Sequence, residues 1–162
     1  MKISLPNSIF RHLGLFLLVI MLLFVSLLSG CSSGSPSAHS VQYKMAPMAD
    51  MSAEIQQSTS SVSDSYRFAV ANPDALKNVP CYCGCVAVGH TSNYSCYVKE
   101  IKPSGEIVFD QHALNCGICV DITLDVMKMT GEGKIPKDIR AAIDQRYGQF
   151  CPSNMPPVQY GQ

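Results

Sequence analysis

Three cysteines alternate with single residues between Pro80 and Cys85, and this spacing constrains the chain more than any other feature. In an extended segment the side chains at i, i+2 and i+4 share one face, so Cys81, Cys83 and Cys85 should point the same way. A disulfide across one residue strains the preferred S–S geometry. These thiols therefore need distant partners or one shared ion, and Gly84 gives the backbone freedom to wrap around that ion.

A second thiol group follows at Cys116 and Cys119, which are one helical turn apart. We expect this pair at the start of a helix, where free N–H groups and the helix dipole lower the pKa of a thiol. Thiolates placed in this way suit metal ligation and redox chemistry alike. The candidate metal ligands are Cys81, Cys83, Cys85, Cys96, Cys116, Cys119, His90 and His112.

The first 30 residues predict a secretory signal peptide. Lys2 and Arg11 form a short basic start, and residues 13–28 are an apolar run that is short for a bilayer span of about 20 residues. The run ends in Leu28-Ser29-Gly30-Cys31, which resembles the bacterial lipobox. We therefore expect lipid on Cys31, palmitate included. The alternative, an uncleaved anchor, lacks a charged stop-transfer flank.

Lipidation at Cys31 predicts a location as well as a partner. The mature chain would hang from membrane lipid at the extracytoplasmic face of the cell membrane, or at the outer membrane of a two-membrane cell. Export also places the other seven cysteines where disulfides can form, although an odd number cannot pair fully within one chain.

Composition excludes several classes of function. Without Lys2 and Arg11 the mature chain has ten basic against twelve acidic side chains, so it offers no basic face for nucleic acid. The sequence has no phosphate-binding glycine loop, HExxH or GxSxG motif. The CxxC pair is not followed by histidine, so covalent c-type haem is not supported. An enzyme is therefore not the favoured interpretation.

The mature chain divides into three parts by composition. Residues 31–63 are rich in small and polar residues and predict a flexible tether. Met45, Met48 and Met51 recur there at every third position, and thioethers suit Cu(I), but we favour chance or a marginal helix. A cysteine-rich domain is expected over 64–150. A proline-rich tail, 151–162, should fold back or fray.

The domain is predicted to be α+β and mainly helical. Apolar residues at 66–71 indicate a short helix, and Asn72-Pro73 indicates the start of the next, with Asn72 as its cap. After an irregular loop over 81–95, strands at 96–101 and 107–109 should form a β-hairpin.

Two further helices are expected to close the domain. The apolar positions Ile118, Ile122, Val126 and Met129 follow the helical period, and Pro136 then opens a second helix that should end near Gly148. We expect these helices to pack as an antiparallel hairpin.

On these residues the chain resembles the bacterial lipoproteins named for a PCYCGC motif. The matching segments are Pro80–Cys85, Gly89–Val98, Phe109–Ala113, Asn115–Ile122 and Gly133–Tyr147. The chain departs from that pattern at Val86-Ala87-Val88, which looks like an insertion, and at Ile135 in place of a capping Ser or Thr. The resemblance implies a lipoprotein and carries no settled activity.

A fainter resemblance links the chain to the thiol oxidoreductases of cytochrome c maturation. It rests on Cys116–Cys119 and on residues 133–150, although the spacing between these two parts is shorter here. This resemblance implies a redox role for the CxxC pair and cytochrome-assembly proteins as partners.

Three interpretations of the thiols therefore stand side by side. The favoured one is binding of a soft metal ion, Cu(I) or Zn²⁺, with metal-trafficking proteins as candidate partners. The alternatives are a thiol–disulfide oxidoreductase that uses Cys116 and Cys119, and a structural or binding domain stapled by disulfides.

Overall fold

The computed structural model describes residues 42–159. The expected signal peptide, Cys31 and the first part of the expected tether lie outside these residues. The described elements are η1 (Met48–Asp50), α2 (Ala53–Gln56), α3 (Ser60–Ala71), α4 (Pro73–Lys77), η2 (Cys85–Val88), η3 (Tyr94–Cys96), β1 (Val98–Ile101), β2 (Ile107–Phe109), η4 (His112–Leu114), α5 (Gly117–Gly131) and α6 (Pro136–Tyr147). Among them, no helix has the length and apolar character needed to cross a bilayer.

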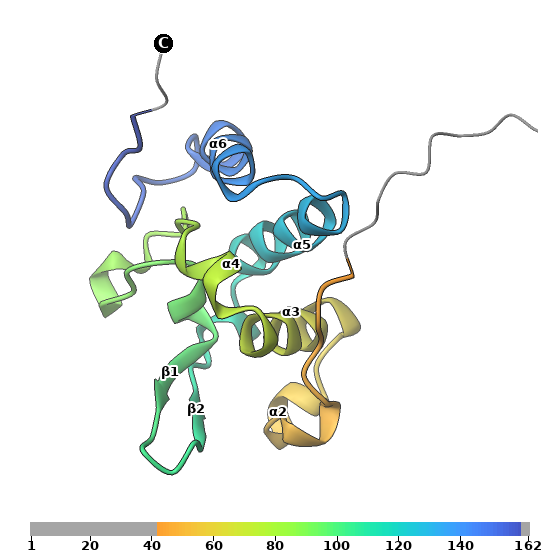
Figure 1. The fold of residues 1–162 in the computed structure, drawn as a ribbon. Coiled ribbons are helices and arrows are strands. Elements are labelled where there is room, and N and C mark those ends of the chain that lie inside the picture. The colour runs from red at the N-terminus through yellow and green to blue at the C-terminus, as the bar shows by residue number, and fades with distance from the viewer. Residues whose placement is uncertain (1–41, 160–162) are drawn as a thin grey trace, which may run out of the picture. The chain divides into compact units, whose positions relative to one another are not determined.

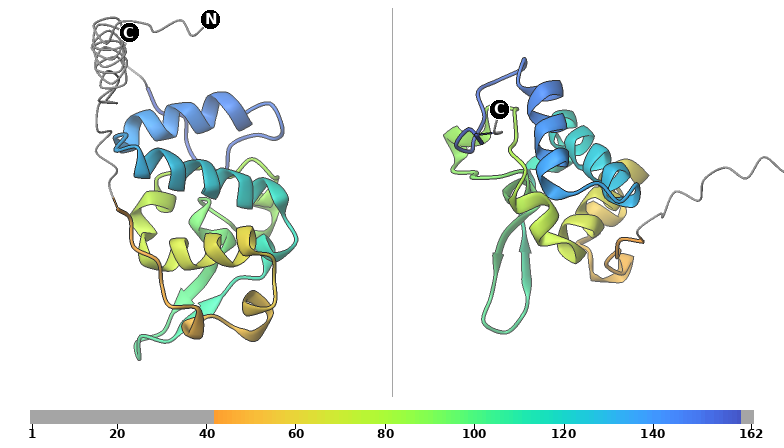
Figure 2. Two further views of the ribbon diagram at one scale, coloured as in Figure 1. Left: turned by 90° about the vertical axis from the view of Figure 1, so that its right-hand side faces the viewer. Right: turned by 45° about the horizontal axis from the view of Figure 1, so that its top comes forward.

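Helix α5 lies between α3 and α6 and forms the centre of the domain (Figures 1 and 2). A short connection containing Gly133, which has a φ of +74°, joins α5 to α6, and the two helices run antiparallel. Pro136 occupies the first turn of α6, where its missing N–H costs no hydrogen bond. The predicted helical hairpin is therefore present.

The two strands pair as an antiparallel hairpin, as predicted, with Ile101 opposite Ile107 and an irregularity between Val98 and Glu100. The hairpin projects from the helices in Figure 1. Its base contacts η3, and η3 contacts α4. The prediction of a mainly helical α+β domain is confirmed.

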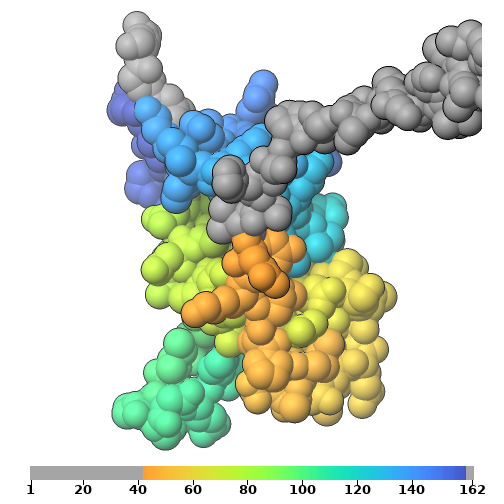
Figure 3. Space-filling view, turned by 45° about the vertical axis from the view of Figure 1, so that its right-hand side comes forward, coloured from red at the N-terminus to blue at the C-terminus, as the bar shows by residue number. Residues whose placement is uncertain are grey.

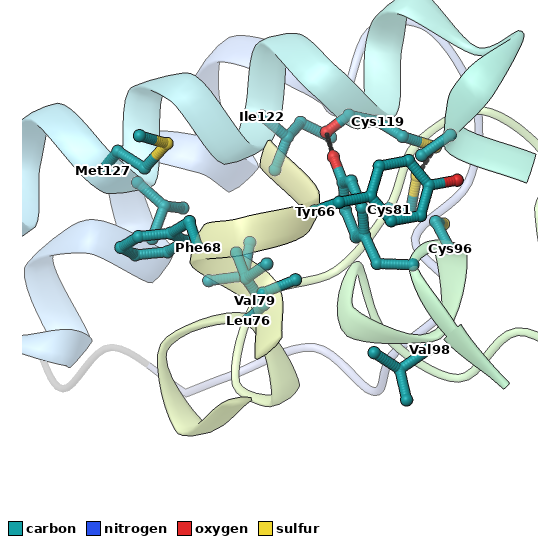
Figure 4. Close-up of a cluster of buried hydrophobic side chains, with 14 of the residues drawn as sticks. Tyr66, Phe68, Leu76, Val79, Cys81, Cys96, Val98, Cys119, Ile122 and Met127 are labelled. Atoms are coloured by element: carbon teal, nitrogen blue, oxygen red, sulfur yellow. Dashed lines mark hydrogen bonds between the residues drawn. The ribbon is translucent and has the colours of Figure 1, made fainter. Parts of the chain in front are cut away.

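The buried core runs from the three-helix contact to the cysteines. Phe68 and Met127 lie at one end of this cluster, and Cys81, Cys96 and Cys119 lie at the other (Figure 4). The thiols are therefore continuous with the hydrophobic core, and the packing of α3 and α5 fixes the position of the loops that carry them.

The end of the expected tether is structured, which corrects the predicted boundary near residue 64. Met51 and Ile55 are buried, and the residues after position 42 lie against the domain surface in Figure 3. The Ala46 N–H donates to the Arg67 carbonyl at 3.1 Å, and Arg67 Nε donates to the Ala46 carbonyl at 2.7 Å. A few well-placed apolar side chains therefore outweigh the polar composition of the segment.

Two local expectations also differ from the structure. Asn72 precedes α4 but makes no capping hydrogen bond to it. Its side-chain amide instead donates to the Lys44 and Phe68 carbonyls and so closes the end of α3. In the methionine series Met51 is buried and Met48 is exposed, so these thioethers do not share one environment.

Candidate metal centre

Segments that are distant in sequence bring the eight candidate ligands together. In the described part of the chain, four groups of these residues have all their ligand atoms within 4.8 Å of one another. The groups are Cys83/His112/Cys116/Cys119, Cys85/His90/Cys96/His112, Cys81/Cys83/Cys85 and Cys81/Cys96/Cys119. Each residue that the sequence singled out as a ligand belongs to at least one group. The structure thus forms one continuous cluster of thiols and imidazoles.

We name Cys83, His112, Cys116 and Cys119 the outer group, because three of these side chains are half-buried. The Cys83 Sγ lies 3.3 Å from His112 Nε2 and 3.6 Å from Cys119 Sγ. Cys116 immediately precedes α5 and Cys119 lies in its first turn, so this helix end contributes two thiols to one place.

We name Cys85, His90 and Cys96 the inner group, because all three side chains are buried. The Cys96 Sγ lies 3.5 Å from His90 Nδ1 and 3.9 Å from Cys85 Sγ. Gly84 precedes Cys85 with a φ of +81°, a left-handed conformation that turns the chain between Cys83 and Cys85. The turn directs Cys83 to the outer group and Cys85 to the inner group.

Cys81 lies between the two groups. Its Sγ is 3.3 Å from Cys83 Sγ and 3.3 Å from Cys119 Sγ, both in the outer group. It also lies within 4.8 Å of the Cys85 and Cys96 sulfurs in the inner group. The sulfur of Cys81 therefore joins the two groups into one cluster.

Hydrogen bonds among the thiols separate their pKa values. Hydrogen bonding from the Cys119 thiol is the main reason that the pKa of Cys116 is lowered to about 7. The pKa of Cys83 is lowered to about 5, mainly by Cys96 and also by His112. The pKa of Cys119 is raised by the same hydrogen bonding to Cys116 and Cys81 and by burial. The lowered pKa expected at the helix start thus occurs at Cys116 and not at Cys119.

Asp110 connects both histidines, and we did not select it from the sequence. Its Oδ2 lies 3.4 Å from His90 Nε2, and its Oδ1 accepts the His112 backbone N–H at 2.8 Å. Tyr66 of α3 donates its hydroxyl to the Asp110 carbonyl at 2.7 Å. A carboxylate at one imidazole nitrogen orients the other toward a metal. Here it leaves His90 Nδ1 facing Cys96.

A buried polar network holds the backbone of Cys119 in place. The Tyr97 hydroxyl donates to the Cys119 carbonyl at 2.8 Å, and the Asn93 amide donates to it at 3.3 Å. The Thr123 hydroxyl lies 2.8 Å from Asn93 Oδ1. Asn93, Tyr97 and Thr123 are fully buried, so this network fixes the start of α5 against the loop before β1.

The C-terminal tail folds back onto the first cysteine segment. Asn154 Oδ1 accepts the Cys81 N–H at 2.7 Å, and its amide donates to the His90 carbonyl at 3.1 Å. The same amide lies 3.7 Å from Cys85 Sγ. No sequence pattern indicates this role, because a lone asparagine in a proline-rich tail looks like any other loop residue.

Tyr82 ties the same segment to α6. Its hydroxyl donates to Asp144 Oδ1 at 2.7 Å, and Arg140 Nε donates to both oxygens of that carboxylate at 2.8 and 3.0 Å. Tyr82 therefore gives this segment a polar anchor to α6. Cys151 belongs to no candidate metal group among residues 42–159.

The fold and this cluster together define a small cysteine-rich α+β domain with groups of thiols and imidazoles that can hold a metal. Residues 19–157 match a family described as proteins of unknown function with a PCYCGC motif, so the chain belongs to that family. The resemblance drawn from Pro80–Cys85 is confirmed. No curated protein and no solved structure gives a significant match.

Proposed function

We propose that the protein is an extracytoplasmic lipoprotein that binds a soft metal ion, Zn²⁺ or Cu(I), through this cluster. The observation that carries the proposal is that six thiols and two imidazoles fall into groups whose ligand atoms all lie within 4.8 Å of one another. Such ligands are the ones that Zn²⁺ and Cu(I) prefer. The ligand set argues against a hydrolytic zinc enzyme, because sulfur-rich zinc sites are mostly closed and structural.

The separations among the ligand atoms support a tetrahedral ion. A zinc ion with Zn–S bonds of about 2.3 Å and Zn–N bonds of about 2.0 Å places two sulfurs about 3.8 Å apart, and sulfur and nitrogen about 3.5 Å apart. The Cys85–Cys96 separation is 3.9 Å and the Cys96–His90 separation is 3.5 Å. Cys83 and Cys119, at 3.6 Å, are close to the same geometry.

The arrangement of partners favours a metal over fixed disulfides. All seven cysteines of the described residues are free thiols, and Cys81 contacts Cys83 and Cys119 equally, at 3.3 Å. A disulfide would join Cys81 to only one of these two neighbours, whereas a metal ion can bind all three sulfurs. The redox alternative draws its support from the lowered pKa of the half-buried Cys116.

The first test measures metal and thiols together. We expect the full chain, purified in detergent under anaerobic conditions, to contain bound Zn²⁺ or Cu(I) and to release protons on reloading. Cys119→Ser should weaken binding at least tenfold, because Cys119 belongs to two of the ligand groups. Elemental analysis, thiol titration and disulfide mapping on one preparation are the measurements.

Cys151→Ser is the matched control, because Cys151 is also a free thiol but lies outside the ligand groups. It should bind metal like the unaltered chain. Six cysteines in three fixed disulfides without metal would establish the structural alternative instead. Rapid exchange of Cys116 with a small disulfide, again without metal, would establish the oxidoreductase.

The location has its own test. We expect Cys31→Ala to release the protein from membranes or to leave it unprocessed, because lipid on Cys31 is the proposed anchor. Fractionation and the apparent mass of the chain are the measurements, and Cys151→Ser is again the control. A variant that stays membrane-bound at mature size would contradict the lipoprotein assignment.

A further inference from the structure

We infer that the cluster is a dinuclear centre that holds two thiophilic ions of unequal lability, one exchangeable and one retained. This inference rests on the proposed metal binding and goes beyond it. It assigns the exchangeable ion to the outer group and the retained ion to the inner group, with the Cys81 sulfur between them.

The number of ligands exceeds what one ion can use. A sulfur-bound zinc ion is almost always four-coordinate, and Cu(I) takes still fewer ligands. The structure brings eight ligand residues into one cluster. His112 lies within 4.8 Å of ligand atoms in both groups. The residues divide into two sets of four when His112 is counted with the outer group and Cys81 with the inner group: the outer set is Cys83, His112, Cys116 and Cys119, and the inner set is Cys81, Cys85, Cys96 and His90.

Cys81 has the position that a bridging thiolate requires. Its sulfur touches Cys83 and Cys119 of the outer set at 3.3 Å and lies within 4.8 Å of Cys85 and Cys96 of the inner set. A thiolate sulfur has more than one lone pair and can bond to two cations at once. A shared anion also offsets the repulsion between neighbouring cations.

Burial divides the two sets. The four inner side chains are all buried, whereas three of the four outer side chains are half-buried. On the inner side, Asp110 holds His90, and Asn154 covers Cys81 and Cys85. A chelator or an acceptor protein can reach the outer ion without moving these groups. It can reach the inner ion only past buried side chains.

A surface hollow opens at two histidines, one from each set. The hollow has a volume of about 360 Å³ and is lined by Val88, His90, Lys99, Asp110, Gln111 and His112. His112 belongs to the outer set and is half-buried at this opening. His90 of the inner set lines the same hollow but is buried, so a small acceptor ligand would meet His112 first, and the outer ion would lose its imidazole ligand before a thiolate ligand.

The experiment loads the full chain with Zn²⁺ in detergent and follows its transfer to excess chelator. We expect two equivalents of zinc, released in two phases of equal amplitude and with rates at least tenfold apart. The same chain loaded with ¹¹³Cd²⁺ should give two resonances, one for each set of ligands. The cadmium measurement needs no variant and so does not depend on how a substitution affects folding.

Two variants then assign the phases. Cys116→Ser should remove the fast phase, and serine is well tolerated at the position before a helix. Cys85→Ser should remove the slow phase and leave one rapidly exchanging ion. Cys151→Ser should keep both phases, and circular dichroism checks the fold of each variant.

The outcomes separate this inference from the proposed function. One zinc per chain with one cadmium resonance would overturn the dinuclear centre and leave the metal-binding proposal standing. No metal at all would overturn both. Two ions released at one common rate would overturn the division into an exchangeable and a retained site.

Discussion

Asn93→Ala should lower the free energy of unfolding of the reduced, metal-free protein by about 2–4 kcal/mol, because it removes two buried hydrogen bonds and opens a cavity. Asn93 is 0% exposed, donates to the Cys119 carbonyl and lies 2.8 Å from the Thr123 hydroxyl. Its backbone N–H donates to the Val79 carbonyl at 2.8 Å, so the backbone of Asn93 contacts the segment before Cys81 while its side chain contacts α5. Urea unfolding followed by circular dichroism measures the loss.

The control for Asn93 is Asn115→Ala, which removes the same side chain at an exposed position. We expect a change within about 0.5 kcal/mol for that variant. An equal decrease in the free energy of unfolding for both variants would show that the buried network does not stabilise the fold more than an exposed asparagine does.

Arg140→Met is the second substitution with a large expected effect. Its side chain is only 7% exposed, pairs with Asp144 and donates to the Pro156 carbonyl at 3.0 Å. Methionine keeps the apolar stem and removes the guanidinium group, which leaves a half-buried carboxylate without that partner. We expect a loss of about 2–3 kcal/mol, below the full cost of breaking a buried pair because Asp144 is 23% exposed.

Arg146→Met provides a matched comparison on the same helix. Arg146 also pairs with an aspartate, Asp125, at 2.8 Å, but its side chain is 67% exposed. A surface pair of this kind contributes about 0–1 kcal/mol. The same urea measurement should therefore separate the two variants by more than 1 kcal/mol. A larger loss from Arg146→Met would mean that the anchor of α6 lies elsewhere.

Most of the architecture could be predicted from the sequence because its signals are local. The spacing of apolar residues predicts α5, and Pro136 predicts the start of α6. The turn residues Pro103-Ser104-Gly105 predict the β-hairpin. The candidate ligands could also be chosen from the sequence, because the closely spaced thiols at 81–85 cannot readily bridge one another. The helix start did bring Cys116 and Cys119 together, as one-turn spacing requires.

The rest depended on contacts between distant parts of the chain. Nothing near Asn154 indicates that its side chain will bind the backbone of Cys81, and nothing near Asn72 indicates that it will close α3 instead of capping α4. Residues 45–56 looked like tether because composition averages over positions, whereas packing depends on single side chains such as Met51 and Ile55. The lowered pKa of Cys116 and the raised pKa of Cys119 likewise depend on thiols from distant segments meeting in one cluster.

The contact between Asn154 and Cys81 also sets the order in which the centre can be completed. A chain leaves the ribosome from its N-terminus, and Asn154 follows the last predicted ligand, Cys119, by 35 positions. All the predicted ligands thus precede the residue that closes over Cys81 and Cys85. If the chain is exported from its N-terminus, as proposed, they also reach the oxidising side of the membrane first. Until Asn154 follows and folds back, an encounter with a metal competes there with oxidation of the thiols.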